Sequence, residues 1–262
     1  MIKEMLLFDL DGTLLLSNGT FSSKTIDILV KCKTKGYGIA IITARSHSQK
    51  NLDLINYIPY DFIAFYNGAQ IYANNRLIKS YLLTFEREIS MLLNLHNDFP
   101  DLAIDVYQEP WHFLSTSNEI FHMKTHARTT CGISQLPNCD IQRIRLRSKH
   151  LSSIPLKNYM TNESAFYYTT QGDAIIVNKK ANKGSAVQYI ANFCHMSTAK
   201  MIAFGDDVND IEMFEKANIG IAMGNAVTAL KEVAYDITDT NDNDGVTSWI
   251  TQNILKKKTL KF

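Results

Sequence analysis

The sequence has almost no net charge and no long apolar run. Its 27 basic and 26 acidic residues leave a formal charge of +1, which is too little to argue for a polyanionic partner such as a nucleic acid. The apolar run from Met5 to Phe8 is far shorter than the roughly 20 residues that span a bilayer, and the first residues lack the layout of a signal peptide. We therefore expect no nucleic-acid partner and no membrane.

Cysteine is scarce, and the sequence contains no CxxC pair. The spacing between Cys131 and Cys139 is too wide for a zinc knuckle, and the other two cysteines are Cys32 and Cys194. We interpret all four as reduced, mostly buried thiols, which favours a cytoplasmic protein. Internal repeats and low-complexity segments are also absent from the sequence.

With 262 residues, 45% hydrophobic and 20% charged, the chain has the composition of a soluble globular protein and a length between one large domain and two ordinary ones. Short apolar runs alternate with helical segments in residues 1–82 and again in residues 183–262. This alternation predicts an α/β fold with a doubly wound parallel sheet. We expect strands at 5–8, 37–42, 62–66, 201–204 and 219–222, a hairpin at 71–78, and helices at about 22–35, 46–56, 184–193 and 210–217.

The pattern changes between residues 83 and 182. A helix is expected at about 86–96, and strands at 103–107, 112–114, 143–147, 166–169 and 174–177. In the strand at 143–147, Ile144 and Leu146 alternate with three arginines, which is typical of a strand with one solvated face. We interpret this part as an α+β domain inserted into the first one.

Two carboxylates follow the expected strand at 5–8, in the segment Asp9-Leu10-Asp11-Gly12-Thr13. Because ligands bind at the carboxyl edge of such a sheet, Asp9 and Asp11 can both reach one site. Gly12 allows a sharp turn that brings backbone N–H groups near an anion. The alternative is an ordinary polar loop, since DxDG also occurs in calcium loops.

Two shorter segments each offer one group for a phosphate. Thr43-Ala44-Arg45 ends the strand at 37–42, where a hydroxyl before a helix N-terminus provides a side-chain donor and backbone N–H groups. Arg45 could equally form a surface ion pair. Lys183 begins the helix expected at 184–193, although a lysine at such a point is more often a solvated surface charge.

The segment Gly205-Asp206-Asp207-Val208-Asn209-Asp210 follows the strand expected at 201–204. Its carboxylates would repel one another, because two unit charges 4 Å apart interact by about 4 kcal/mol at an effective dielectric constant of 20. A hard divalent cation would relieve this repulsion, and Mg²⁺ keeps coordination positions open for water and a phosphate. The alternative is an acidic loop spread into solvent.

Together, and in this chain order, the four segments resemble the motifs of the haloacid dehalogenase superfamily of phosphohydrolases. The position of the insert resembles the Cof-like branch, whose α/β cap lies between the second and third motifs, and Asn67-Gly68-Ala69 and Asp244-Gly245-Val246 are similar to further landmarks. The resemblance implies a Rossmann-like catalytic core formed by residues 1–82 and 183–262. It also implies a cap at 83–182 that governs substrate specificity.

The resemblance also implies a catalytic role for three residues. Asp9 is similar to the family nucleophile, which becomes an aspartyl-phosphate, and Asp11 to the acid that protonates the leaving group and then deprotonates water. Lys183 would neutralise charge on Asp9 and on the phosphate. Since an exposed lysine is rarely structural, we expect Lys183→Ala to leave the protein folded.

Further residues would bind the phosphoryl group and the implied cofactor, Mg²⁺. The phosphoryl-binding set implied by the resemblance is Thr43, Ala44, Lys183 and Asn209. The metal would be held by Asp9, the backbone carbonyl of Asp11, and Asp206, with Asp207 and Asp210 behind them or as auxiliary ligands.

The activity that the resemblance implies is hydrolysis of a small phosphorylated metabolite such as a sugar phosphate, pyridoxal phosphate or a flavin-type phosphate. The sequence leaves open a phosphomutase with the same motifs, a non-catalytic module that senses a phosphorylated metabolite, and the oligomeric state. Candidates for recognising the substrate in the insert are His112, His122, His126 and Arg128, taken collectively because any single one is more often solvated or core-filling.

Overall fold

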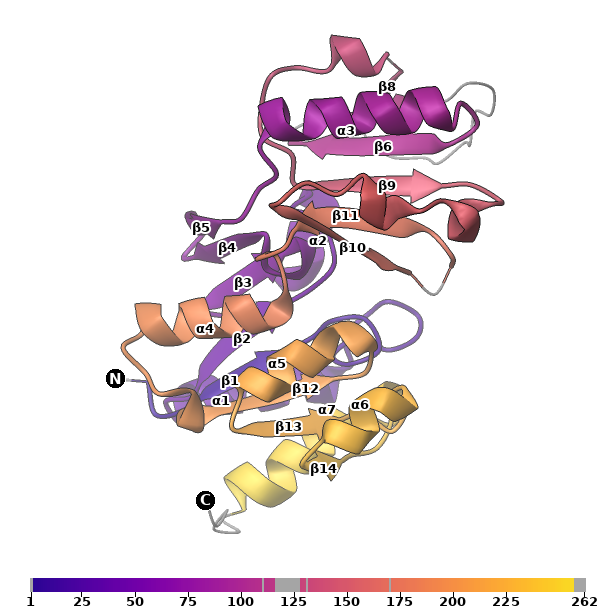
Figure 1. Ribbon diagram of the computed structural model, residues 1–262. Helices are drawn as coiled ribbons and strands as arrows, with labels where there is room; N and C mark the ends of the chain where they lie inside the picture. Colours follow the sequence, from indigo (N-terminus) through magenta and orange to yellow (C-terminus); the bar gives the residue numbers. More distant parts are fainter. Residues whose placement is uncertain (1, 110, 116–127, 131, 170, 257–262) are drawn as a thin grey trace. The chain divides into compact units, whose positions relative to one another are not determined.

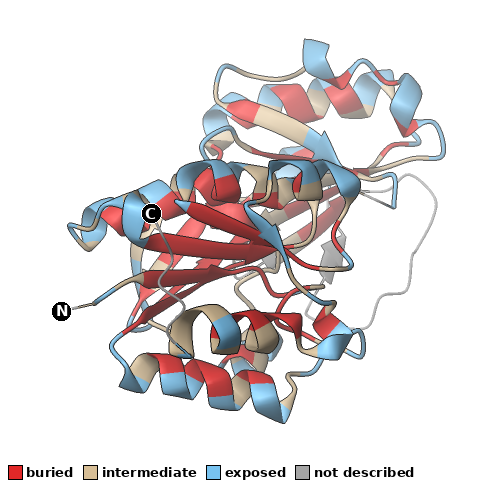
Figure 2. Cartoon of the chain, turned by 90° about the horizontal axis from the view of Figure 1, so that it is seen from below, coloured by how far each residue is buried: buried red, intermediate tan, exposed pale blue. Residues whose placement is uncertain are grey.

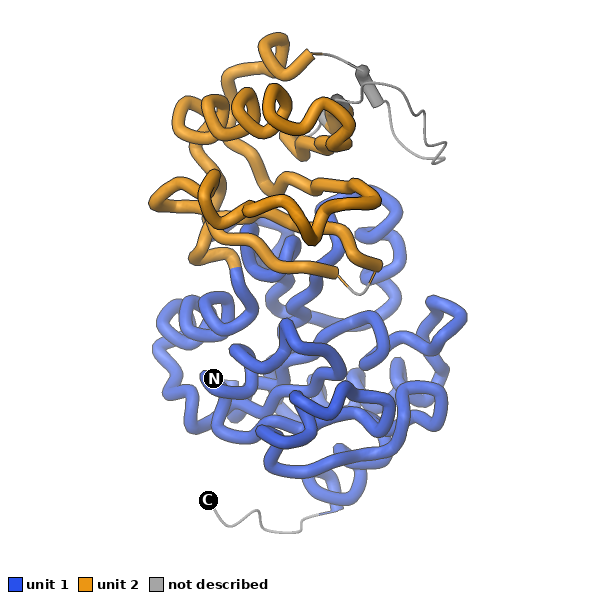
Figure 3. Tube along the Cα trace, turned by 45° about the vertical axis from the view of Figure 1, so that its right-hand side comes forward, with its two compact units in different colours: residues 1–80, 182–262 blue, residues 81–181 orange. Residues whose placement is uncertain are grey.

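The computed structural model describes residues 2–109, 111–115, 128–130, 132–169 and 171–256. The chain forms two compact units, shown in different colours in Figure 3. We call residues 1–80 and 182–262 the core unit, and residues 81–181 the inserted unit. Each unit is built around a sheet of its own (Figure 1).

The sheet of the core unit has eight strands in the order β14-β13-β12-β1-β2-β3-β4-β5. Neighbours from β14 to β3 are parallel, whereas β3, β4 and β5 pair antiparallel. The strands are β1 (Met5–Phe8), β2 (Gly38–Ile42), β3 (Phe62–Phe65), β4 (Gln70–Ala73), β5 (Arg76–Ser80), β12 (Met201–Gly205), β13 (Ile219–Ala222) and β14 (Asp236–Ile237).

Helices cover this sheet on both faces, as its continuous apolar strands require. Helices α1 and α7 pack together, while α4, α5 and α6 pack against one another in a separate layer. Figure 2 shows the buried strands between layers of helices. The predicted doubly wound α/β fold is therefore confirmed. The helices are α1 (Ser23–Thr34), α2 (Gln49–Ile55), α4 (Lys183–Phe193), α5 (Ile211–Lys216), α6 (Thr228–Val233) and α7 (Gly245–Ile250).

The strand order places a topological switch point beside β1. From β1 the chain winds to β2 on one side, and it later returns to β12 on the other side. In open α/β sheets ligands bind at such a point, outside the carboxyl ends of the strands. Asp9, Thr43 and Asp206 directly follow β1, β2 and β12, so the fold brings three of the motifs to this edge.

Short sequence patterns correctly predicted the start of one helix and the turn of one hairpin. The Ser22 hydroxyl accepts a hydrogen bond from the Thr25 N–H at 3.0 Å and caps α1, as expected. Asn74 and Asn75 have φ values of 50° and 59° between β4 and β5, the left-handed conformation that tight hairpins need. Helix α2 begins later than expected, at Gln49, and the Asn51 side chain donates to the Ser46 carbonyl in the preceding loop.

The sheet of the inserted unit has six strands in the order β10-β11-β9-β6-β7-β8, antiparallel except for the β7–β8 pair. Helix α3 (Phe85–Asp98) buries Met91, Leu92 and Leu95 in the same apolar cluster as Ile144 and Leu146 of the sheet. The predicted inserted α+β domain is thus confirmed. Its strands are β6 (Ala103–Gln108), β7 (Trp111–Ser115), β8 (Arg128–Thr130), β9 (Arg143–Arg147), β10 (Ser164–Tyr168) and β11 (Ala174–Asn178).

The arginines of β9 lie on the face of the sheet opposite to its apolar cluster, as their alternation predicted. Arg145 pairs with Asp173, and Arg147 Nη2 lies 3.0 Å from Asp105 Oδ2. The third guanidinium, that of Arg143, lies 4.3 Å from the centroid of the Tyr107 ring. Tyr107 in turn stacks on His112 with centroids 3.9 Å apart. We call these three side chains the Arg143–Tyr107–His112 stack.

Two further expectations concern membranes and cysteines. Within the described ranges, no helix is both long and apolar enough to cross a bilayer. Cys32, Cys139 and Cys194 form no disulfide, but only Cys32 of these three is buried. The expectation of mostly buried thiols is therefore wrong for Cys139, which is exposed in the loop before β9. Cys131 lies outside the described residues.

Candidate active site

Lys183, in the first turn of α4, forms ion pairs with two carboxylates at the carboxyl edge of the core sheet. Its side chain is 0% exposed, and Nζ donates to Asp9 Oδ1 at 2.5 Å and to Asp210 Oδ1 at 2.7 Å. Burial alone would lower the pKa of Lys183, but the charges of Asp210 and Asp9 outweigh it and raise that pKa. The expectation of an exposed lysine is therefore wrong, because the lysine is drawn inward by two acidic partners.

The cap of α4 explains how Lys183 reaches this position. Asn182 is the N-cap residue, and its Oδ1 accepts the Ser185 N–H at 2.7 Å. Gly184 lies so close to α5 that a Cβ there would be 2.7 Å from the Glu212 carbonyl oxygen. The first turn of α4 is therefore fixed tightly against the segment that carries Asp210.

Asp210 also organises the acidic loop after β12. Its Oδ2 accepts the backbone N–H groups of Asp206 at 2.9 Å and Asp207 at 3.1 Å. Asp207 Oδ1 accepts the Val208 N–H at 2.7 Å and caps the short turn that follows. Asp207 and Asp210 thus shape the loop with their carboxylates, and this local bonding explains why the acidic segment does not spread into solvent.

Asp206 faces the turn after β1. Its Oδ1 accepts a hydrogen bond from the Thr13 hydroxyl at 3.1 Å. A Cβ on Gly12 would lie 2.2 Å from Asp206 Oδ2, and Gly12 has a φ of 78°, so no other residue fits at this position. Burial, followed by the charge of Asp210, raises the pKa of Asp206 to about 7.

The carboxylates of this edge fit a hard divalent cation. Oxygen atoms of Asp9, Asp206 and Asp210 lie within 4.8 Å of one another. Burial raises the pKa of Asp9 well above its usual value, and Asp210 and Asp206 add to the rise although Lys183 opposes it. One ammonium therefore does not offset the negative charge gathered here, and an all-oxygen donor set suits Mg²⁺.

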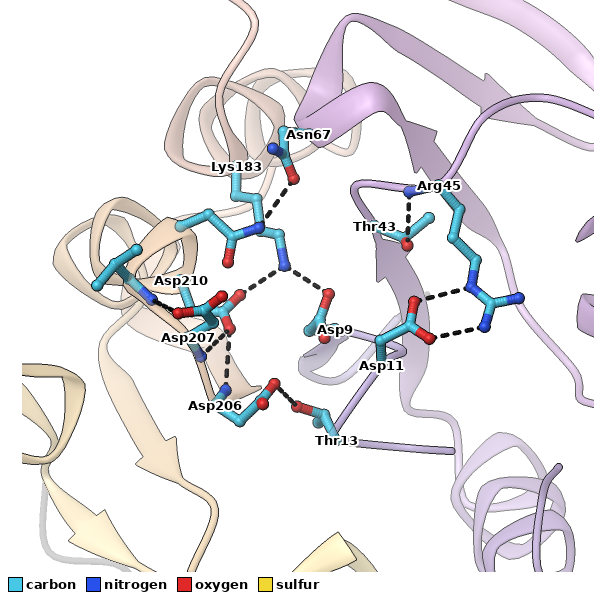
Figure 4. A network of polar contacts seen from close by, with 12 residues as sticks. Asp9, Asp11, Thr13, Thr43, Arg45, Asn67, Lys183, Asp206, Asp207 and Asp210 are labelled. Atoms are coloured by element: carbon cyan, nitrogen blue, oxygen red, sulfur yellow. Dashed lines mark hydrogen bonds and ion pairs between the residues drawn. The ribbon is translucent and has the colours of Figure 1, made fainter. Parts of the chain in front are cut away.

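The structure brings two members of the predicted metal set, Asp9 and Asp206, into this cluster. The third carboxylate is that of Asp210, whose oxygens are already engaged by Lys183 and two backbone N–H groups. Asp11 was predicted to contribute its backbone carbonyl, and its carboxylate lies elsewhere. Figure 4 shows Asp9 directed toward Lys183, whereas Asp11 is directed toward Arg45.

Arg45 and the Asp11 carboxylate form a bidentate ion pair. Nε donates to Asp11 Oδ2 at 2.8 Å and Nη2 to Oδ1 at 2.6 Å, although the Asp11 side chain is 59% exposed. The hydrogen bond to Asp11 raises the pKa of Arg45 despite its partial burial. Sequence reasoning treated Arg45 as a possible surface pair, and it missed that the partner is the expected acid catalyst.

Thr43 is fully buried at the end of β2. Its hydroxyl oxygen accepts the Arg45 N–H at 3.1 Å, so it shapes the loop before α2. It does not cap that helix, which starts only at Gln49. Ala44 lies in the same loop and is half-buried.

Asn209, predicted to bind phosphoryl oxygens, is linked to a residue with no predicted role. Its Nδ2 donates to Asn67 Oδ1 at 3.1 Å. Asn67 is 4% exposed and lies in a turn directly after β3. The Asn-Gly pair in the sequence marks a turn, but its proximity to Asn209 depends on the fold.

Comparisons with known proteins agree with this arrangement. A family model described as haloacid dehalogenase-like hydrolase matches residues 6–250. The chain is 27% identical over 263 residues to the 5-amino-6-(5-phospho-D-ribitylamino)uracil phosphatase YitU of Bacillus subtilis, covering 95% of this chain and 96% of the relative. It is 24% identical over 280 residues to the pyridoxal phosphate phosphatase YbhA of Escherichia coli, covering 97% and 100%.

Among solved structures, the phosphatase BT1666 from Bacteroides thetaiotaomicron superposes with a TM-score of 0.82 at 24% identity. The match covers 96% of this chain and 95% of that chain. At this level of identity the superposition establishes the fold.

Proposed function

Because the chain belongs to the haloacid dehalogenase-like hydrolase family, as its motifs indicated, we propose that it is a magnesium-dependent phosphatase. The proposed reaction transfers a phosphoryl group from a small phosphorylated metabolite to Asp9 and then to water. The relatives named above are phosphatases, which supports this reaction class. The Cof-like position of the insert, between β5 and α4, agrees with the same assignment.

One observation carries the proposal: a buried lysine fixes the Asp9 carboxylate at the switch point of the sheet. Lys183 binds Asp9 through Oδ1. This contact leaves the lone pairs of the second oxygen, Oδ2, for an electrophile. A carboxylate held in this way, beside Asp206 and at the end of β1, is suited to nucleophilic attack on phosphorus.

In the first step, an Asp9 oxygen forms a bond to phosphorus while the bond from phosphorus to the leaving oxygen breaks. Lys183 offsets negative charge on Asp9 and on the incoming phosphoryl group. Thr43, the Ala44 N–H and Asn209 hold phosphoryl oxygens. Asp11 gives its proton to the leaving oxygen, so the alcohol departs neutral.

In the second step, water attacks the phosphorus of the aspartyl-phosphate and Asp11 takes the proton that the water loses. The bond from Asp9 to phosphorus breaks, and inorganic phosphate leaves. Mg²⁺ would be held by Asp9, Asp206 and the backbone carbonyl of Asp11, where it would stabilise negative charge on the phosphoryl oxygens.

Arg45 provides a resting position for Asp11. In the structure both oxygens of Asp11 accept hydrogen bonds from the guanidinium, which is the arrangement of an ionised carboxylate. To deliver a proton, Asp11 has to turn away from Arg45, take up a proton from solvent and face the leaving oxygen. Its 59% exposure leaves room for this rotation.

We assign the choice of substrate to the inserted unit, because all the groups with chemical roles belong to the core unit. The Arg143–Tyr107–His112 stack provides a guanidinium, a phenol and an imidazole for contacts with the substrate. Of the residues expected to recognise the substrate, His112 is part of this stack. His122 and His126 lie outside the described residues, and Arg128 begins β8, with its side chain not described. Sugar phosphates, pyridoxal phosphate and flavin-type phosphates are the candidate substrates.

The experiment that tests the proposal measures phosphate release from p-nitrophenyl phosphate and from a panel of these metabolites, with Mg²⁺ and with excess chelator. We expect turnover that requires Mg²⁺ and is poorly supported by Ca²⁺, whose larger and looser coordination misplaces the phosphate. Borohydride reduction during turnover should convert the acyl phosphate at Asp9 to homoserine, identified by mass spectrometry. Unchanged turnover in excess chelator would contradict the metal dependence.

The same measurements separate the two alternatives. A phosphomutase would release little phosphate to water unless a sugar bisphosphate is present, because its phosphoryl group returns to a second hydroxyl. A non-catalytic sensor would bind phosphorylated metabolites without turnover. The assembled and buried Asp9–Lys183–Asp210 contacts favour a catalytic site over a sensor.

A further inference from the structure

Three consecutive residues after β3 adopt left-handed backbone conformations. Tyr66, Asn67 and Gly68 have φ values of 52°, 56° and 102°. A left-handed conformation is common for glycine and tolerated by asparagine, but it is costly for tyrosine. Such strain persists only where the surroundings enforce it, and it clusters at functional sites.

The surroundings that enforce this turn are two of the four motif segments. The Tyr66 N–H donates to the Arg45 carbonyl at 2.9 Å, and the Asn67 N–H donates to the Thr43 carbonyl at 2.8 Å. On its other side, Gly68 lies so close to Asn182 that a Cβ would be 2.7 Å from that carbonyl oxygen. The turn therefore packs tightly between the end of β2 and the start of α4.

The Asn67 side chain extends this contact to a third segment, the acidic loop that carries Asn209. Its Oδ1 accepts a hydrogen bond from Asn209 Nδ2 at 3.1 Å, although the two residues are far apart in the chain. An amide can present either its oxygen or its nitrogen to a ligand. By accepting one N–H of Asn209, Asn67 fixes which end is the donor and leaves the second N–H of the same nitrogen to be directed elsewhere.

From this geometry we infer that Asn67 is a positioning residue for Asn209, which it orients so that the amide N–H, and not the carbonyl oxygen, faces a phosphoryl oxygen. This inference rests on the proposed function, in which Asn209 binds the phosphoryl group. The left-handed turn serves to place the Asn67 acceptor between the end of β2, the start of α4 and the acidic loop. Asn67 itself makes no contact with phosphate in this scheme.

The test uses Asn67→Gly, because glycine adopts the left-handed conformation freely and the substitution removes only the side chain. We expect about a tenfold weaker affinity for inorganic phosphate by calorimetry and about a tenfold lower kcat/KM with p-nitrophenyl phosphate, the size of one lost hydrogen bond. The matched control is Asn74→Gly, an exposed asparagine with a φ of 50° in the β4–β5 hairpin. It should change neither quantity, and both variants should remain folded at the assay temperature.

A double-mutant cycle separates positioning from a structural role. If Asn67 acts through Asn209, adding Asn67→Gly to Asn209→Ala should change phosphate affinity and kcat/KM by less than about twofold. A further tenfold loss in that background would overturn the inference, since Asn67 would then act directly or through the backbone. Wild-type values in Asn67→Gly would also overturn it. If the wild-type protein neither binds phosphate nor hydrolyses the ester, the proposed function fails as well.

Discussion

The buried carboxyls at the candidate site of the core unit and the buried carboxyl of Glu88 in the inserted unit have opposite surroundings. In the core unit, Asp9 and Asp210 share the ammonium of Lys183, which has a 0% exposed side chain. In the inserted unit, Glu88 of α3 is 0% exposed, and its Oε1 accepts a hydrogen bond from the Thr161 hydroxyl at 2.6 Å. The neighbouring Arg87 pairs with Glu163. The core site thus surrounds its buried carboxyls with a shared cation, whereas the buried carboxyl of Glu88 accepts from a neutral hydroxyl. Asp105 of the inserted unit, which is 1% exposed and pairs with Arg147, resembles the core site in this respect.

The cationic side chains of the two units also differ in their burial and in their partners. Lys183 donates to two buried carboxylates, and in the interior its charge can stabilise negative charge on the reacting groups. The arginines of β9 lie on one face of a sheet, two paired with Asp105 and Asp173 and the third against the Tyr107 ring. This contrast favours a core unit that performs the reaction and an inserted unit that selects what reacts.

The largest effect is expected from Asp9→Asn, which removes the nucleophile and keeps the shape of the side chain. Turnover of p-nitrophenyl phosphate should fall by at least about 10⁴-fold, while Tm stays close to that of the wild type because Lys183 retains Asp210. Asp27→Asn, an exposed residue of α1, is the matched control and should be neutral. Turnover like that of the wild type in Asp9→Asn would end the covalent hypothesis.

Lys183→Ala should damage both rate and stability. We expect a loss of about 10²–10³-fold in kcat, since a donor to developing charge disappears. Stability should fall by about 3–5 kcal/mol, because two buried carboxylates lose their shared cation. The control is Lys180→Ala, which removes an exposed lysine just before α4. A variant with full stability would show that the contrast between the units is not one of buried charge.

The sequence predicted the edge of the core sheet well, because three of the four motifs directly follow a short, wholly apolar strand. β1, β2 and β12 are buried throughout, so their ends could be recognised from composition alone. Helices α6 and α7 and strand β14 were not predicted. Each spans six residues or fewer, too short for a periodic pattern to stand out.

The partners of the site residues were harder to predict than the residues themselves. Arg45 and Asp11 are 34 positions apart in the chain, and Lys183 is buried only because α4 starts beside Asp9 and Asp210. The Asn67–Asn209 bond spans 142 positions. Such contacts follow from strand order, and no local pattern records them.

A smaller effect is expected from the Arg143–Tyr107–His112 stack. Replacing His112 or Arg143 by alanine should reorder kcat/KM among sugar phosphates, pyridoxal phosphate and flavin-type phosphates by about 5- to 50-fold, the range of one or two lost contacts. Hydrolysis of p-nitrophenyl phosphate, whose leaving group demands little recognition, should barely change. Arg87→Ala, on α3, serves as the control. Equal losses for every substrate, or an unchanged ranking, would contradict the assignment of specificity to the inserted unit.

The smallest effect concerns Glu88 and is one of stability alone. Burial raises the pKa of Glu88 above its usual 4.5, more than its hydrogen bonds to Thr161 and Ser164 lower it. The folded protein therefore keeps the proton to a higher pH than the unfolded chain. Stability linked to this group is fully present below about pH 4.5 and is lost as the pH rises through the folded-state pKa.

Glu88→Gln mimics the protonated carboxyl at every pH, so it should stabilise the protein at neutral pH and have little effect near pH 4. The measurement is the difference in Tm between variant and wild type across this range. Glu86→Gln is the matched control, since Glu86 lies exposed in the same first turn of α3 and should show no such dependence. A Glu88→Gln variant that is destabilised at pH 7 would mean that the carboxyl is ionised and paired in the folded protein. Glu88 would then be a buried charge like the carboxylates of the core site, and the contrast between these two sites would fail.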